Sequence, residues 1–242
     1  MKRALLLSLA VLAAVAVSAQ LNVQLHYDFG HDFYGHELSL RPRMTATIEN
    51  FTPDQWGSTY FFADADIADQ SVKSFYAEIS RELRCWDAPI AAHVEFNGGV
   101  SGAAGSYDNA YLVGPAWNWH SKDFARTFSV QLLYKYMAHK ANHGNTNHSV
   151  QLTEVWGLDF AKGLCRFSGF CDLWYDKGVN GHWVLGSESQ FWVNLWKLSG
   201  FNENAKLSVG TELEITNNLI WPRNGKNNRF YVIPTLAVKW TF

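Results

Sequence analysis

The sequence predicts an all-β protein, a transmembrane antiparallel up-and-down β-barrel of about twelve strands. Three observations lead to this prediction. Apolar and polar residues alternate with a period of two through segments of roughly ten to fifteen residues, which gives each segment one apolar face. Such segments exceed the usual soluble strand of about five or six residues and match a tilted strand that crosses a bilayer. Short and long connections alternate between them, as expected for a barrel whose two rims differ.

Residues 1–19 have the layout of a secretory signal peptide. The basic residues Lys2 and Arg3 are followed by an apolar run and by the small residues Val-Ser-Ala before Gln20. The apolar run is shorter than the ~20 residues that a transmembrane helix needs. We therefore expect export and cleavage, which leaves one barrel domain over residues 20–242.

The composition after the signal agrees with a membrane barrel. Loss of two basic residues takes the formal net charge from −2 to −4, and this mildly acidic balance gives no sign of nucleic-acid binding. Aromatic residues make up 15% of the chain, with 11 Trp, yet no apolar run after the signal could form a spanning helix. A soluble, Trp-rich sandwich has a similar composition, so composition alone leaves that alternative open.

The predicted strands divide the chain into twelve segments, an even number, as single-chain bacterial barrels require. They are 21–30, 41–51, 57–66, 71–85, 89–100, 107–119, 124–138, 149–161, 164–176, 182–198, 204–216 and 229–242. One set of connections is short: 52–55, 86–88, 120–123, 162–163 and 200–203. The interleaved set is on balance longer and richer in Gly, Asn and His: 31–36, 67–70, 101–106, 139–148, 177–181 and 217–228. With both termini in the periplasm, the short turns are periplasmic and the longer loops external.

The two faces of a predicted strand differ sharply in polarity. In the eleventh segment, Leu207, Val209 and Leu213 share one face, and Glu212 and Glu214 share the other. A soluble sandwich would bury the apolar set in a shared core and leave the polar set in water. A membrane barrel instead turns the apolar set toward lipid and the polar set toward a wet lumen.

Two charged residues, Arg81 and Glu154, fall on the predicted lipid face. Either they lie near a membrane interface, or a β-bulge shifts the phase of the strand there.

The cysteines are an odd number in an exported chain. Cys165 and Cys171 lie six residues apart on one predicted strand, which at ~3.3 Å per residue is too far for a disulfide, and Cys85 falls at a distant turn. We predict no structural disulfide, and no Cys/His spacing matches a zinc site.

The last segment, 229–242, alternates strictly and ends on Phe242, with Trp240 two residues earlier. It resembles the closing strand of Gram-negative outer-membrane β-barrels, whose terminal aromatic residue is read by the barrel-assembly machinery. This resemblance implies a location in the outer membrane of a Gram-negative bacterium, among its lipids, and recognition of Phe242 during assembly. We expect a monomer in which this strand pairs with 21–30 and seals the barrel without a free edge.

The strand phases also predict which side chains line the lumen. They are His26, Asp28, Arg41, Arg43, Glu49, Tyr60, Phe62, Asp64, Asp66, Tyr76, Glu78, Glu82, Arg84, His93, Glu95, Asn118, Gln131, Lys135, Arg166, Asp172, Trp174, Glu188, Gln190, Trp192, Lys206, Glu212, Glu214 and Lys239. A mildly acidic lumen with aromatic faces disfavours small anions and suits polar neutral or cationic solutes that stack. The alternative is a closed lumen in which these charges pair, through Arg43, Lys135, Arg166 or Lys239, and brace the wall.

Three stretches carry a more specific resemblance: 46–56 (ATIENFTPDQW), 60–64 (YFFAD) and 74–82 (SFYAEISRE). They resemble successive strands of Tsx-type nucleoside-specific channels, with an inward acid and aromatic, a Trp at the periplasmic turn and an aromatic-rich strand ending Ala-Asp. The resemblance covers about forty residues; beyond Cys85 only the architecture matches. It implies a channel for nucleosides, with bases held by aromatic and sugars by polar side chains. The substrate-binding positions that carry over are Glu49, Tyr60, Phe62, Asp64 and Glu78.

Other function classes have weaker support in the sequence. A lipid-modifying enzyme would need a Ser/His pair at the rim, but no Gly-x-Ser-x-Gly elbow occurs and no pairing is recognisable. The loop histidines are His31, His36, His139, His143 and His148, and the last three have spacings that define no metal-binding strand or helix face. A structural or adhesion barrel would usually carry longer loops. We therefore expect no catalytic residue, no metal and no cofactor.

Overall fold

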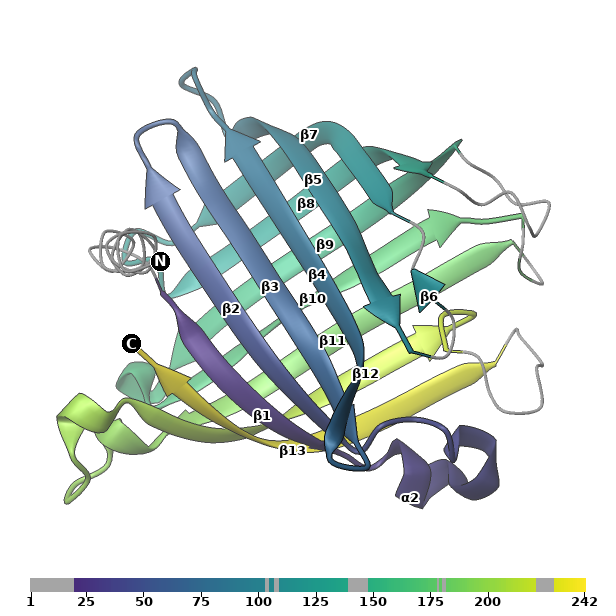
Figure 1. Ribbon diagram of the computed structural model, residues 1–242. Coiled ribbons are helices and arrows are strands. Elements are labelled where there is room, and N and C mark those ends of the chain that lie inside the picture. The colour runs from purple at the N-terminus through teal and green to yellow at the C-terminus, as the bar shows by residue number, and fades with distance from the viewer. Residues whose placement is uncertain are drawn as a thin grey trace, which may run out of the picture.

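A computed structural model describes residues 20–102, 105–106, 109–138, 148–177, 179, 182–220 and 229–242. Within these residues, twelve long antiparallel strands and one short strand form a single closed barrel (Figure 1). No helix within them is long and apolar enough to cross a membrane. The predicted signal peptide, 1–19, lies outside the described residues, so its cleavage stays a prediction.

Each of the twelve predicted strands has a counterpart in the structure. The strands are β1 (Asn22–Asp28), β2 (Met44–Asp54), β3 (Gly57–Ala68), β4 (Ser71–Leu83), β5 (Ile90–Ser101), β6 (Gly105–Ser106), β7 (Ala110–His120), β8 (Arg126–Met137), β9 (His148–Phe160), β10 (Cys165–Tyr175), β11 (Trp183–Asn194), β12 (Leu207–Asn217) and β13 (Phe230–Thr241). The helical turns are α2 (Gly30–Tyr34), η1 (Gly35–Leu38), η3 (Ala161–Gly163), η4 (Leu195–Lys197) and η5 (Glu203–Ala205). The twelve-strand barrel is therefore confirmed, and the short β6 is an addition to it.

Two predicted segments differ most from the structure. The segment 31–36, expected to be a plain loop, is helical: it overlaps α2 from its second residue onward and includes the first half of η1. The predicted strand 182–198 ends at Asn194, and the connection to β12 runs over 195–206 with η4 and η5 inside it. Alternation continued past the end of the strand in the sequence, but hydrogen bonding to the neighbouring strand did not.

The barrel closes where its first and last strands meet. β1 pairs antiparallel with β13, Leu25 opposite Val238, and on its other edge with β2. The remaining strands pair with their neighbours in sequence, including β4 with β5, so the ring has no free edge. β1 begins and β13 ends at the rim that carries the short turns, and α2 and β6 lie at the opposite rim (Figure 1).

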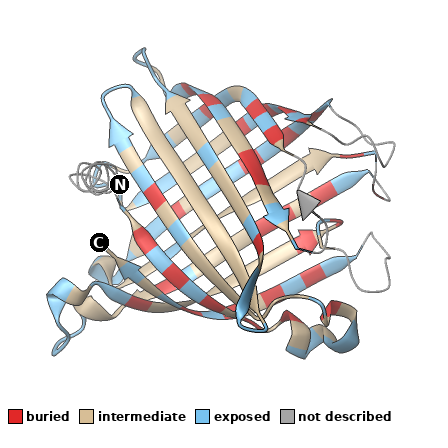
Figure 2. Cartoon of the chain, in the orientation of Figure 1, coloured by how far each residue is buried: buried red, intermediate tan, exposed pale blue. Residues whose placement is uncertain are grey.

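Burial along the strands is reversed relative to a soluble protein. On β1, the polar Gln24 and His26 are 1% and 3% exposed, whereas the apolar Val23 and Leu25 are 42% and 41% exposed. Buried and exposed residues also alternate along much of β8, β9 and β13 (Figure 2). A soluble sandwich buries its apolar face, so this pattern excludes that alternative and identifies an outer surface built for lipid.

The two charged residues on the predicted lipid face do point outward. Arg81 lies two residues from the end of β4 and forms an ion pair with Asp54 at 2.7 Å, close to the short-turn rim. Glu154 lies at the centre of β9, which pairs residue by residue with β8 and β10 through that point. A membrane interface therefore explains Arg81, but neither an interface nor a β-bulge explains Glu154.

Apolar side chains fill part of the barrel interior. Ala110, Leu112, Leu133 and Met137 form a buried cluster on the inner faces of β7 and β8. A second cluster joins Leu38 of η1 to Tyr231 and Ile233 on the inner face of β13. The segment after β1 thus packs against the inside of the wall at its mouth. The inward residues of β3 remain only partly buried, which leaves a polar interior along that wall.

Candidate functional site in the barrel lumen

The five residues predicted to bind solute lie together on one wall of the lumen. Glu49 of β2, Phe62 of β3 and Glu78 of β4 are direct neighbours across the three strands. Tyr60 and Asp64 flank Phe62 on the inner face of β3. Because the three strands are consecutive and in regular register here, alternation alone was enough to place these side chains side by side.

An aromatic ladder runs along this wall. The ring of Phe62 lies 6.2 Å from that of Tyr60 and 6.1 Å from that of Tyr76 on β4. The Tyr76 hydroxyl donates a hydrogen bond to the Glu78 carboxylate at 2.6 Å. Ring faces beside fixed acceptors form a surface on which a flat, polar solute can stack and donate hydrogen bonds.

Neutral donors hold the carboxylates of this wall. Thr47 donates to Asp64 at 2.5 Å, and Gln24 donates to Glu49 at 2.8 Å. Asp66, one step further along β3, accepts from Thr45 at 2.8 Å and from Ser74 at 2.5 Å. These hydrogen bonds fix the carboxylates in place without cancelling their charge.

A second acidic wall faces the first one. Glu188 of β11 interacts electrostatically with Glu212 of β12, on the neighbouring strand. It also interacts with Asp64 and Glu78 across the lumen. Gln190 donates to Glu212 at 2.8 Å, and on β10 Asp172 accepts from Thr153 at 2.5 Å. The lumen therefore brings together carboxylates from strands that are more than a hundred residues apart in sequence.

Few of these carboxylates have a cationic partner. Arg41 contacts both Asp28, at 2.7 Å, and Glu214. His93 lies 3.0 Å from Glu95 and 3.6 Å from Glu82. The other lumen acids form no ion pair with a Lys, Arg or His of the described residues. They are Glu49, Asp64, Asp66, Glu78, Asp172, Glu188 and Glu212.

The two lumen lysines lie over indole rings. The ammonium of Lys135 is 4.0 Å from the ring centre of Trp174 and donates to Gln151 at 2.7 Å. The ammonium of Lys239 is 4.0 Å from the ring centre of Trp192. Lys239 was expected to pair with a carboxylate, and it instead makes a cation–π contact.

The bracing network expected as an alternative is thus only partial. Arg166 pairs with Asp159 at 3.0 Å, as that alternative required, but Arg43 does not reach the lumen acids. Three basic residues assigned to the lumen lie outside it, because they precede or follow their strands. Arg43 pairs with Asp32 of α2 at the rim at 2.8 Å, and Arg84 and Lys206 are exposed in turns.

The rim charges are set by contacts outside the strands. The pKa of Asp32 lies below its usual value, mainly because Arg43 donates hydrogen bonds to it. Burial alone would lower the pKa of Arg41, but Glu214 and Asp28 raise it above its usual range. Arg41 therefore keeps its positive charge at the mouth of the lumen.

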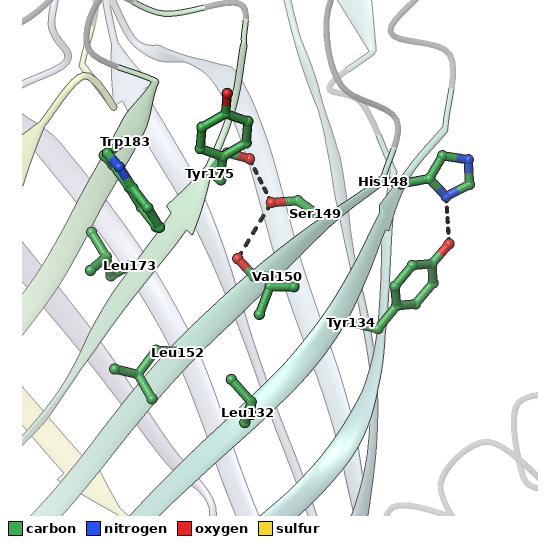
Figure 3. Close-up of a pocket in the computed structure, with 9 residues that line it drawn as sticks. All are labelled: Leu132, Tyr134, His148, Ser149, Val150, Leu152, Leu173, Tyr175 and Trp183. Carbon is green, nitrogen blue, oxygen red and sulfur yellow. Dashed lines mark hydrogen bonds between the residues drawn. The ribbon is translucent and has the colours of Figure 1, made fainter.

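A Ser/His neighbour pair at the external rim does not have nucleophilic geometry (Figure 3). The Ser149 hydroxyl donates to the backbone carbonyl of Tyr175 at 2.5 Å, and His148 contacts the Tyr134 hydroxyl at 2.5 Å. His139 and His143 lie outside the described residues. Among those that are described, no group of three or more His, Cys, Asp or Glu side chains could hold a metal ion. Cys85, Cys165 and Cys171 are free thiols.

A closed antiparallel barrel with an apolar outer belt and a polar lumen defines a transmembrane β-barrel of the outer-membrane type. Residues 19–242 match the model of the family described as a domain of unknown function, DUF5020, and the chain belongs to that family. No curated protein matches the sequence.

Solved structures of porins are similar to the barrel. The NanC porin, in a rhombohedral crystal form, is 12% identical with a TM-score of 0.57, over 92% of this chain and 100% of that chain. The KdgM porin is 10% identical with a TM-score of 0.49, over 92% of this chain and 99% of that chain. At such identities the likeness to NanC concerns the fold.

Proposed function

We propose that the protein is a passive outer-membrane channel for small polar solutes, with nucleosides as the leading candidates. One observation carries the proposal: an aromatic ladder lies between lumen carboxylates that have no cationic partner. Such a wall attracts cations and stacks flat neutral solutes, and it disfavours anions. Movement would be facilitated diffusion through weak successive contacts, with no chemical step.

The proposed solute contacts are Glu49, Tyr60, Phe62, Asp64 and Glu78, the positions that the Tsx resemblance implies. Their support is the shared wall of β2 to β4 and the ring distances within it. Glu188 and Glu212 extend this site across the lumen, and sequence reasoning placed them in the lumen but not in the site. We also propose that the signal peptide directs export in a Gram-negative bacterium and that Phe242 is read during barrel assembly.

Planar-bilayer recording tests this proposal. Purified mature protein is expected to give small single-channel steps, a reversal potential that shows cation selectivity in a KCl gradient, and partial block by adenosine. Glu49→Gln should lower the cation selectivity because it removes a lumen carboxylate, and Phe62→Ala should weaken the block. Asp87→Asn removes a charge from an exposed turn and should change neither.

Three outcomes would contradict the proposal. Folded protein that shows no conductance at any voltage would favour a closed, structural barrel. Anion selectivity would show that the lumen acids do not control passage. Release of lyso-lipid from liposomes that contain the protein would instead favour a lipid-modifying enzyme.

A further inference from the structure

Glu154 is the one outward charged residue of the described strands that lies far from a strand end. It is exposed at the centre of β9, six residues from either end of the strand. The other outward charged residues of the described strands stand within two residues of a strand end: Asp54, Lys73, Arg81 and Arg126. Within the described residues, Glu154 forms neither an ion pair nor a hydrogen bond. Acyl chains offer it no donor, so lipid alone is a poor neighbour for it.

The two strands that follow β9 carry further polar groups on the same face. Cys171 on β10 is its register neighbour, and Ser187 on β11 is the neighbour of Cys171. Ser189 follows on the same face of β11, opposite Gly169. Ser187 donates to the backbone carbonyl of Phe170 at 2.7 Å, whereas the Ser189 hydroxyl has no partner among the described residues. An acceptor on β9 thus lies two strands from an available donor on β11.

A hollow of about 640 Å³ opens on the same surface, between the strand ends that carry His148, Tyr175 and Trp183 (Figure 3). Leu152, two residues before Glu154 on β9, forms part of its floor. Tyr134 and His148 lie on one side, and Tyr175 and Trp183 lie on the other. The polar patch and the hollow therefore form one continuous surface over β8 to β11.

We infer that this surface binds a second copy of the chain, in a side-by-side dimer about a two-fold axis parallel to the barrel axis. Such an axis over β10 places β9 of each barrel opposite β11 of the other, because both copies are inserted in the same direction. Each Glu154 then meets a donor from Ser189 or Cys171 of the other copy, and the contact is made twice. The patch is self-complementary, which favours a second copy over an unrelated protein. This inference departs from the monomer expected from the sequence and does not depend on what passes through the lumen.

Single-molecule photobleaching in large vesicles tests the dimer. Labelled wild-type protein should bleach in two steps at protein-to-lipid ratios where Glu154→Leu bleaches mainly in one. The loss of two hydrogen bonds should raise the dimer dissociation constant by at least about tenfold. Glu154→Gln keeps hydrogen-bonding capacity and should stay largely dimeric. Ile48→Leu alters the outer face of β2, on the opposite side of the ring, and should behave as wild type.

Cross-linking locates the interface. A variant that keeps only Cys171, with Cys85 and Cys165 changed to Ser, should give a product of twice the chain mass with a short bis-maleimide. A cysteine-free variant with Ile48→Cys should not. Heat-modifiable mobility on gels confirms that each variant is folded before it is compared.

The inference is overturned by a wild-type protein that bleaches in one step at every ratio, or by Glu154→Leu dimerising as wild type does. A Cys171 product formed in native membranes with a mass other than twice the chain would also overturn it, since the partner would then be a different protein.

Discussion

Replacement of Arg41 by Met, at the mouth of the lumen, should destabilise the barrel more than the loss of an exposed ion pair does. Arg41 contacts Asp28 at 2.7 Å and also Glu214, and the three side chains are 25%, 6% and 14% exposed. Removing one partner of a fully buried ion pair costs about 3–5 kcal/mol, because the remaining charge is left uncompensated. Since water reaches a quarter of Arg41, we expect a loss of about 2–3 kcal/mol in the free energy of unfolding.

Urea unfolding in large vesicles, followed by Trp fluorescence, measures this loss. Arg166→Met is the matched control, because its pair with Asp159 at 3.0 Å is 37% and 33% exposed and should contribute at most about 1 kcal/mol. The combination of Arg41→Met with Asp28→Asn and Glu214→Gln removes the uncompensated charges and should recover at least half of the lost stability. If Arg41→Met costs no more than Arg166→Met, or if the triple variant is as unstable as the single one, the charge argument fails.

Three further predictions concern the lumen, the rim and one turn. Phe62→Ala should reduce stability by no more than about 2 kcal/mol, because its ring is only partly buried, while weakening nucleoside block in bilayers; unchanged block would remove Phe62 from the site. The depressed pKa of Asp32 stabilises the fold above the usual value of 3.8, and this contribution is lost as pH falls through the lower, folded pKa. Arg43→Gln should therefore reduce stability at neutral pH and converge with wild type in acid, as equilibrium unfolding across pH would show. Gly57→Ala should destabilise the turn between β2 and β3 by about 1–3 kcal/mol, because φ is +144° and a Cβ would lie 2.0 Å from the Glu82 carbonyl oxygen; a variant with the thermal stability of wild type would contradict this.

The wall of β2 to β4 could be predicted because its residues alternate along consecutive strands with regular pairing. The strand phase and the short connections are enough to place Glu49, Phe62 and Glu78 side by side. The opposite wall could not be assigned to the site in the same way. Which strands face each other across a lumen depends on the cross-section of the closed ring, and alternation carries no information about that.

The errors arose where strands end. Arg41 and Arg43 alternate in phase with β2, but β2 begins at Met44, so neither side chain is placed by the pleat. Arg41 turns inward because Asp28 and Glu214 hold it, and Arg43 turns to Asp32. The loop between β1 and β2 is likewise ordered by contacts that the sequence pattern does not show. Its few apolar residues gave no helical pattern, and Leu38 is ordered by tertiary packing against Tyr231 and Ile233.

The indole contacts of the two lumen lysines explain how the lumen can contain cations and remain electronegative. Trp192 is fully buried, and its ring nitrogen donates to Gln190 at 2.9 Å, which in turn donates to Glu212 at 2.8 Å. Lys239 is thus held on the face of the same indole that is linked to Glu212 through the neutral amide of Gln190. A cation on an aromatic ring stabilises the wall without neutralising an acid, as a salt bridge would. In the proposed channel, Glu212 and Glu188 are then available to a passing solute, as a cation-preferring lumen requires.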